Sequence, residues 1–221
     1  MKLAIYDFDG TLFLKDTLPF LGREWIRQKR STSRYIFTYL SILPFFVLYK
    51  AGLMSREKMK YHAIKRFNRL FKEMSREEIA EFFSQAYPYM EKYFNKQMKK
   101  ELETSRAEGF HSVLLSGAYA ELMKIVAREL KIDTVLAAEL SFRDGVFDHD
   151  GEIAFVDGES KLSLLREAFQ RENVDWQASR SYADSYSDLA VMEIVGEPVA
   201  VNPDFQLYAH ARKNDWRVIL S

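Results

Sequence analysis

The chain of 221 residues contains no cysteine, so it can form neither a disulfide nor a zinc site with cysteine ligands. A secretory signal needs a long apolar stretch, but the run that starts at Met1 reaches Asp7 and Asp9 too soon to supply one. Internal repeats and low-complexity linkers are also missing. These absences fit a reducing compartment, and we expect a cytoplasmic protein.

A net charge is lacking as well, because 32 Lys and Arg balance 32 Asp and Glu. The balance is uneven along the chain. Residues 15–73 hold 14 basic and 4 acidic residues, a net charge of +10, so the remainder carries −10. At this length, an apolar fraction of 48% suffices for one core with a smaller attached domain. The uneven charge indicates two modules with different roles.

Residues 16–106 have the pattern of an all-helical insert. Strong helix formers and aromatic residues recur there at spacings of three and four, without a strand pattern. Ser55 is the expected N-cap of one helix, and Ser75 with Glu78 forms a capping-box pattern at the start of another.

The remainder of the chain alternates strands with helices, which predicts a parallel α/β sheet. A short buried strand at residues 2–6 is followed by predicted strands at 111–117, 134–140, from 180, 198–204 and 216–220, with helices at 118–130 and 161–170. Residues 141–156 alternate, with turn signals at Asp144-Gly145 and Asp150-Gly151, and predict a β-hairpin or flap.

Polar groups follow four of these segments, at the edge where ligand sites form in an open α/β sheet. They are Asp7 with Asp9, Ser116 with Gly117, Lys161 at a helix start, and Asp184 with Asp188. Acidic side chains gathered around a lysine make structural sense when a cation lies among them, and hard oxygen ligands suit Mg²⁺. A carboxylate held by a metal and a lysine stays ionised and can attack phosphorus.

The same set of groups indicates phosphoryl transfer. Ser116 precedes a predicted helix, where free backbone N–H groups favour an anion. Side chains two apart on an extended strand share a face, so Asp7 can point at phosphorus while Asp9 reaches the bridging oxygen. Gly10 allows the tight turn that this requires.

The segments DFDGTL, LLSGAY, GESKLSLL and YADSYSDL, in this order, resemble the four motifs of the haloacid dehalogenase superfamily. Their spacing is similar to that of its phosphoserine-phosphatase-like subfamily. The resemblance implies a Rossmann-like α/β core of parallel strands, residues 1–14 and 107–221, with an all-helical cap, residues 15–106, inserted after the first strand. A second aspartate in the first motif, rather than a serine, separates the phosphatases of this superfamily from its dehalogenases.

The family pattern also implies the catalytic roles. Asp7 is the nucleophile that forms an aspartyl-phosphate, and Asp9 is the general acid and base. Mg²⁺ is held by Asp7, the backbone carbonyl of Asp9 and Asp184, while Asp188 supports the metal through its waters. Lys161 offsets the negative charge of the nucleophile and the phosphate.

Substrate binding is assigned in the same way. Ser116 hydrogen-bonds the phosphoryl oxygens, and Gly117 and Thr11 belong to the same substrate-binding set. Asp16 matches by position an acidic residue that binds the substrate ammonium in phosphoserine phosphatases.

The chain departs from the family pattern at three positions. Asp16 stands where the family has the longer Glu, His62 lies near the position of a carboxylate-binding arginine, and Ala183 replaces the glycine before the fourth motif's first aspartate. The identity of the phosphate ester therefore stays open.

The segment from Tyr35 to Tyr49 is a run of 15 residues without a charge. A straight helix of this length spans roughly 22 Å, short of the ~30 Å hydrocarbon core of a bilayer, and Pro44 is expected to interrupt it. We therefore predict a buried cap helix rather than a transmembrane segment. The alternative is a peripheral contact with an anionic membrane, with basic flanks such as Arg34 and Lys50 facing the lipid.

These observations predict a Mg²⁺-dependent phosphatase that hydrolyses a small-molecule phosphate monoester through an aspartyl-phosphate. Three alternatives stay open: a phosphatase of phospholipid-derived phosphates at the membrane surface, a phosphotransferase to an alcohol, and a binding module without catalysis. The intact motif set argues against the last of these. The aromatic residues of the cap are expected to pack in its core rather than on nucleic acid, so no nucleic-acid partner is expected.

Overall fold

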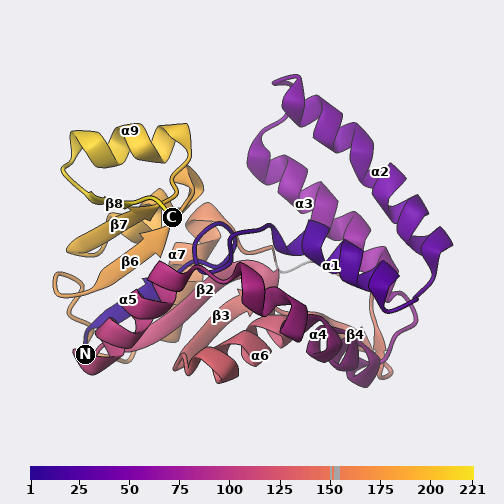
Figure 1. Cartoon of the computed structure of the whole chain (residues 1–221), viewed down its shortest axis with the longest axis horizontal. Helices are drawn as coiled ribbons and strands as arrows, with labels where there is room; N and C mark the ends of the chain where they lie inside the picture. The colour runs from indigo at the N-terminus through magenta and orange to yellow at the C-terminus, as the bar shows by residue number, and fades with distance from the viewer. Residues whose placement is uncertain (150, 152–154) are drawn as a thin grey trace. The chain divides into compact units, whose positions relative to one another are not determined.

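The computed structural model describes residues 1–149, 151 and 155–221, and the chain divides into two compact units (Figure 1). The core unit comprises residues 1–16, 89–138 and 156–221. The helical unit comprises residues 17–88 and 139–155. Each unit therefore combines segments that are far apart in the sequence.

A six-stranded parallel sheet forms the centre of the core unit, in the order β3-β2-β1-β6-β7-β8. The strands are β1 (Leu3–Tyr6), β2 (His111–Tyr119), β3 (Thr134–Ala138), β6 (Arg180–Ala183), β7 (Glu197–Val201) and β8 (Arg217–Ile219). The strand order changes direction between β1 and β6, and such a switch point is where ligands bind in open parallel sheets. The predicted parallel α/β fold is confirmed.

Helices cover both faces of this sheet, so β1 is apolar and buried along its whole length. The helices of the core unit are η2 (Glu91–Tyr93), α5 (Lys96–Ala107), α6 (Ala120–Leu130), α7 (Gly158–Ala168), η3 (Tyr186–Asp188), α8 (Leu189–Met192) and α9 (Phe205–Lys213). Leu3 and Ile5 of β1 pack with Leu165 of α7. Tyr6 points to the opposite face, where its O–H donates to Ser105 of α5 at 3.0 Å.

Two stacked tyrosines join β1, β6 and α5. The rings of Tyr6 and Tyr182 are parallel, with 4.7 Å between their centroids. The Tyr182 O–H donates to Oε2 of Glu101 at 3.0 Å, and Arg217 binds the same carboxylate. Burial, followed by the charge of Glu101, raises the pKa of Tyr182 to about 12. Burial also raises the pKa of Tyr6.

This pair predicts a loss of stability at alkaline pH. The unfolded chain ionises Tyr182 near its ordinary pKa of 10, so the stabilisation from the neutral phenol is complete below pH 10 and is lost as the pH rises through about 12. The free energy of unfolding of Tyr182→Phe should therefore fall less over this range than that of the wild type. Urea unfolding at stepped pH measures this, with the exposed Tyr208→Phe as control. Equal falls in the wild type and Tyr182→Phe would contradict the prediction.

Two helices of the helical unit begin where the sequence predicts. Its helices are α1 (Thr17–Arg27), α2 (Thr32–Lys50), α3 (Arg56–Phe67), η1 (Asn68–Phe71) and most of α4 (Arg76–Met90). The Oγ of Ser55 accepts from the Lys58 N–H at 3.3 Å, which confirms this N-cap. The capping box is confirmed too, because the Ser75 N–H donates to Glu78 at 2.7 Å and the Glu78 N–H donates to Ser75 at 3.2 Å.

An aromatic core holds the helical unit together. The ring of Phe71 contacts the rings of Trp25, Phe82, Phe83 and Phe147 at centroid distances between 5.7 and 6.4 Å. Such edge and tilted contacts each add about 0.5–1.5 kcal/mol to the burial of apolar area. The expectation that the aromatic residues of the cap pack in its core is confirmed for Trp25, Phe71, Phe82 and Phe83.

The predicted hairpin forms, but it belongs to the helical unit. The strands β4 (Phe142–Arg143) and β5 (Val146–Phe147) pair antiparallel, and Asp144 and Gly145 take the positive φ values of 52° and 80° that a type I′ turn requires. The Phe147 N–H donates to the carbonyl of Met74 at 2.9 Å. The second predicted turn includes Asp150, which lies outside the described residues.

The two units differ from the predicted domain boundaries for a reason that local patterns do not reveal. The prediction grouped α5 with the cap because it is helical, whereas Ser105 and Glu101 of α5 bind the tyrosines of the core sheet. The hairpin was grouped with the core, but its Phe147 packs in the aromatic core of the helical unit. Burial partners, not helix or strand pattern, decide which unit a segment joins.

The helix α2 departs from prediction in two respects. It continues through Pro44, which has no N–H to donate to the carbonyl of Leu40. Leu40 is exposed, so water can replace the missing hydrogen bond. The expected interruption is therefore wrong. The prediction of a buried helix is also wrong, because of its 19 residues, all of them described, Thr38 alone is buried. Within the described residues, no helix has the length and hydropathy to cross a bilayer.

Candidate active site

Three predicted site residues lie on neighbouring strands at the carboxyl edge of the sheet. Asp7 follows β1, Asp184 follows β6, and Ser116 lies near the end of β2. The register keeps Asp7 and Asp184 close, since Tyr6 pairs with Tyr182 and the Asp7 N–H donates to the Tyr182 carbonyl at 3.0 Å. The fold therefore brings the first and fourth motifs together at its switch point.

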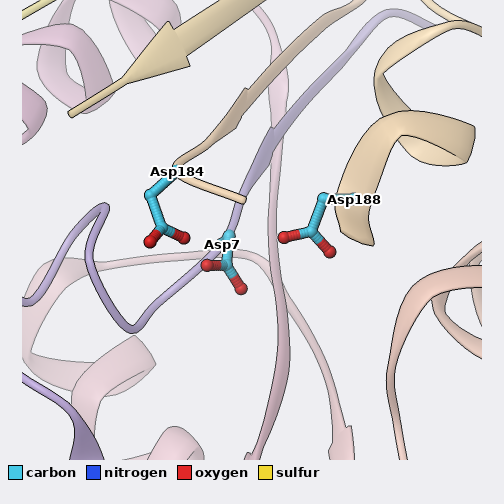
Figure 2. Close-up of side chains that lie close together, drawn as sticks. All are labelled: Asp7, Asp184 and Asp188. Carbon is cyan, nitrogen blue, oxygen red and sulfur yellow. The ribbon is translucent and has the colours of Figure 1, made fainter. Parts of the chain in front are cut away.

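Asp7, Asp184 and Asp188 form an acidic cluster (Figure 2). Each residue offers one carboxylate oxygen, and the three oxygens lie within 4.8 Å of one another. The side chains of Asp7 and Asp188 are only 11% and 6% exposed. Buried like charges at this spacing repel one another unless a cation offsets them.

Lys161 supplies part of the offsetting charge. Its Nζ lies 2.7 Å from Oδ1 of Asp7 and 2.7 Å from Oδ1 of Asp188. A capping box of Asp157 and Ser160 starts α7 and sets the position of the lysine. Burial alone would lower the pKa of Lys161, but the charges of Asp188 and Asp7 outweigh it and raise the pKa. The lysine stays charged and balances one of the three carboxylates.

The remaining carboxylate charge fits a hard divalent cation. The cluster consists of carboxylates, which are the ligands that Mg²⁺ prefers, and Mg²⁺ is usually bound by one or two carboxylates together with several waters. The family resemblance implies that Asp188 acts through such waters. The structure adds a direct ion pair between Asp188 and Lys161.

Gly10 lets Asp184 approach the loop after β1. Its φ of +82° lies in the left-handed region, and a Cβ at this position would lie 2.4 Å from Oδ2 of Asp184. The turn is held by the Gly10 N–H, which donates to the Phe13 carbonyl at 2.7 Å, and by the Phe13 N–H, which donates to the Phe8 carbonyl at 2.9 Å. The tight turn predicted at Gly10 is therefore present.

Ser116 and Gly117 lie at an irregular end of β2. The pairing with β3 shifts between Ser116 and Tyr119, and the Oγ of Ser116 accepts from the Ala118 N–H at 3.0 Å. A Cβ on Gly117 would lie 2.6 Å from the carbonyl oxygen of Val156, so only glycine fits this close approach. The helix α6 starts at Ala120 rather than at 118. Ser116 thus presents its hydroxyl from a bulged strand, not from the first turn of a helix.

Asp204 is a positioning residue that is absent from the predicted site. Its Oδ2 accepts from the Tyr186 N–H at 2.9 Å, and its own N–H donates to the carbonyl of Asp184 at 2.8 Å. Its Oδ1 accepts from the Leu207 N–H at 2.9 Å and caps α9. In the segment PVAVNPD this aspartate follows a strand, which is the same signal that points to Asp7.

The other predicted residues show different degrees of support. Thr11 is fully buried, and its Oγ1 has no hydrogen-bond partner in the described part of the chain. Such a hydroxyl in a native structure calls for a water, an ion or another bound group. Asp9 is half-buried in the turn after β1, and Asp16 is exposed directly before α1. The roles of Asp9 in proton transfer and of Asp16 in ammonium binding stay predictions.

Comparison with known proteins agrees with this geometry. Residues 4–193 match the family described as haloacid dehalogenase-like hydrolase. Phosphoserine phosphatase SerB1 of Mycobacterium tuberculosis (strain ATCC 25618 / H37Rv) is 27% identical over 222 residues, which cover 97% of this chain and 69% of that protein. Histidinol-phosphatase of Neisseria meningitidis serogroup C (strain 8013) is 23% identical over 228 residues, which cover 99% of this chain and 98% of that protein.

The fold is also found in a solved structure. The crystal structure of a protein with unknown function from Bordetella pertussis Tohama I matches with a TM-score of 0.83 and 20% identity, covering 99% of this chain and 97% of that chain. The family match spans all four motifs, from Asp7 to Asp188. The chain therefore belongs to the haloacid dehalogenase-like hydrolase family and is a phosphatase similar to phosphoserine phosphatase.

Proposed function

We propose that this phosphatase hydrolyses a small-molecule phosphate monoester in a Mg²⁺-dependent reaction, through an aspartyl-phosphate at Asp7. The environment of Asp7 carries the proposal. Lys161 binds one of its oxygens at 2.7 Å, and Asp184 and Asp188 complete a carboxylate cluster around it. A carboxylate that a lysine orients within such a cluster is placed to act as a nucleophile.

We assign three groups to Mg²⁺: the carboxylates of Asp7 and Asp184 and the backbone carbonyl of Asp9. Asp188 would support the metal through its waters. When bound, Mg²⁺ supplies positive charge that offsets the phosphate and the carboxylates. The geometry supports this assignment, because one carboxylate oxygen from each of Asp7, Asp184 and Asp188 lies within 4.8 Å of the other two.

The chemistry of the chain's own residues follows in two steps. In the first, the free oxygen of Asp7 bonds to phosphorus, the ester P–O bond breaks, and Asp9 gives its proton to the leaving alcohol. In the second, Asp9 takes a proton from water, the water oxygen bonds to phosphorus, and the bond from phosphorus to Asp7 breaks. Inorganic phosphate leaves, and both aspartates return to their starting states.

Ser116 and Thr11 are the hydroxyls that we assign to the phosphoryl oxygens. Ser116 stands on the strand beside Asp7, and Thr11 is a buried donor without a partner in the described residues. Lys161 faces the same oxygens with a charge that is already in place. Donors held in position before the reaction stabilise the transition state without reorganisation.

Hydrolysis of p-nitrophenyl phosphate with and without Mg²⁺ tests the proposal. We expect activity with Mg²⁺ and none after treatment with a chelator. Acid quenching with a ³²P-labelled substrate should trap label on the protein at Asp7. Full activity after chelation, or turnover without a trapped phosphoprotein under single-turnover conditions, would overturn the metal or the covalent part of the proposal.

A substrate panel then identifies the ester. It includes phosphoserine and histidinol phosphate, which the names of two relatives suggest, with sugar phosphates, nucleotides and lysophospholipid phosphates. Product analysis with added alcohols separates hydrolysis, which yields inorganic phosphate alone, from transfer, which yields a new phosphate ester.

The approach of Gly10 to Asp184 gives a prediction with a matched control. Gly10→Ala should lower kcat about 100-fold, because the new Cβ displaces Asp184 from the cluster. Gly109→Ala has a similar φ of +78° with nothing within 4 Å, so it carries only the conformational cost of about 1 kcal/mol. Steady-state kinetics and urea unfolding of both variants separate the two effects. Equal activity in both variants would contradict the prediction.

A further inference from the structure

The helix α2 has apolar side chains on its outward side as well as on its inner side. Its inner side packs on α1 and α3 of the same unit (Figure 1). Tyr35 lies against Gly22 of α1, and the ring of Phe45 stacks on that of His62 of α3 with 4.2 Å between the centroids. Its most buried residue is Thr38, a polar one. A usual surface helix confines its apolar side chains to the side that faces the core, whereas α2 has them on its outward side as well.

The outward side of α2 forms an exposed apolar face. Its large exposed hydrophobic residues are Ile36, Phe37, Tyr39, Leu40, Leu43, Phe46, Val47 and Leu48. Phe37 is 74% exposed and Val47 is 55% exposed. Scattered hydrophobic residues on a surface need no explanation, but a contiguous patch on one helix indicates a binding surface.

Basic residues are concentrated in the segment that contains this face, and Lys50, Lys58, Lys65, Arg69 and Lys72 among them are exposed. Residues 30–72 contain ten Lys and Arg against a single acid, Glu57. The basic residues are Arg30, Arg34, Lys50, Arg56, Lys58, Lys60, Lys65, Arg66, Arg69 and Lys72. Lys50 ends α2 and lies over the rings of Phe46 and Tyr49 at 5.5 and 5.6 Å, so a cation borders the apolar face directly.

We propose that α2 docks on the surface of an anionic phospholipid membrane, with its apolar face in the interfacial region and Lys50 and the exposed basic residues that follow it toward the lipid phosphates. An interfacial helix needs an apolar face together with nearby Lys and Arg, and α2 with its flanks offers both. Each basic residue near an anionic surface contributes attraction that salt weakens. The binding is peripheral, because α2 lacks the length and hydropathy of a spanning helix.

Charge favours an anionic membrane over a second copy of the chain as the partner of the apolar face. A symmetric dimer through α2 would bring two segments of net charge +9 together, since residues 30–72 hold ten basic residues and one acid. Such like charges oppose association, whereas an anionic bilayer attracts the same residues. The apolar face alone fits either occupant, and the basic flanks select the membrane.

Co-sedimentation with vesicles tests the proposal. We expect the wild-type protein to bind vesicles of phosphatidylcholine with phosphatidylglycerol at low salt, and to bind vesicles of phosphatidylcholine alone at least about tenfold more weakly. Added salt should weaken the binding. The double variant Phe37→Glu/Val47→Glu should lose at least about tenfold in binding, because it places charges on the inserted face.

The matched control is Phe205→Glu on α9, which replaces an aromatic residue of 85% exposure outside α2. It should bind vesicles as the wild type does. A second variant, Lys50→Glu/Lys58→Glu, keeps the apolar face and tests the charge. Thermal unfolding confirms that each variant is folded.

Three results would overturn the proposal. One is no binding of the wild type to anionic vesicles at low salt. Another is an equal loss in Phe37→Glu/Val47→Glu and Phe205→Glu. The third is a wild-type dimer in light scattering that becomes monomeric in Phe37→Glu/Val47→Glu without any vesicle binding, because it would assign the face to a second copy.

Discussion

Replacing Asp7 with asparagine should abolish phosphate-ester hydrolysis, with kcat lowered at least about 10³-fold. The amide oxygen of asparagine carries no full charge and does not attack phosphorus as a carboxylate does. The substitution also removes the carboxylate whose Oδ1 lies 2.7 Å from Nζ of Lys161. Steady-state kinetics with p-nitrophenyl phosphate and Mg²⁺ measure the effect.

The fold should survive this change. Asp7, Asp184 and Asp188 carry three negative charges against one lysine, so removal of one carboxylate charge relieves repulsion within the cluster. The melting temperature of Asp7→Asn should therefore equal or exceed that of the wild type in the absence of Mg²⁺. Asp215→Asn is the control, because Asp215 is exposed at a φ of +55°, where asparagine is well tolerated. Near-wild-type turnover of Asp7→Asn would remove the nucleophile from the proposal.

Replacing Lys161 with methionine should damage both activity and stability. Methionine keeps the apolar stem of the lysine but leaves Asp7 and Asp188 without the cation that binds both at 2.7 Å. Breaking a buried ion pair in this way costs about 3–5 kcal/mol of the free energy of unfolding. Loss of the charge that faces the phosphoryl oxygens should lower kcat about 100-fold or more.

Two measurements separate this effect from a general packing defect. Urea unfolding without Mg²⁺ should show the full destabilisation of Lys161→Met, and added Mg²⁺ should restore part of it, because a cation that binds the native cluster stabilises the folded state. Lys100→Met, at an exposed position of α5, should change neither stability nor activity. Lys161→Met that matches the wild type in stability without Mg²⁺ would show that the ion pair contributes nothing to the fold.

The sequence predicts the ends of the secondary-structure elements and the residues of the site better than it predicts their partners. The N-caps at Ser55 and Ser75 and the turn at Gly10 depend on neighbours within a few residues, so the local pattern suffices. The acidic cluster also follows from sequence, because parallel strands align their carboxyl ends and place Asp7 beside Asp184.

The misses share one physical cause, which is that the partner of a side chain lies far away along the chain. Asp204 orients the loop of Asp184 although it lies twenty residues later in the chain. Its role depends on the position of the end of β7 beside that loop. The alternating pattern around Phe147 is compatible with a hairpin in either unit. Only the aromatic core around Phe71 decides where Phe147 packs.

What the sequence by itself determined is therefore the chemistry: a pair of aspartates after a buried strand, a serine, a lysine and two further aspartates, in an order that specifies a phosphatase of the haloacid dehalogenase-like family. Only the tertiary structure decided that α5 belongs to the core, that the hairpin of 142–147 belongs to the helical unit, and that the apolar run of α2 faces outward. The reason is that periodicity identifies an apolar face, whereas the three-dimensional packing determines what covers it.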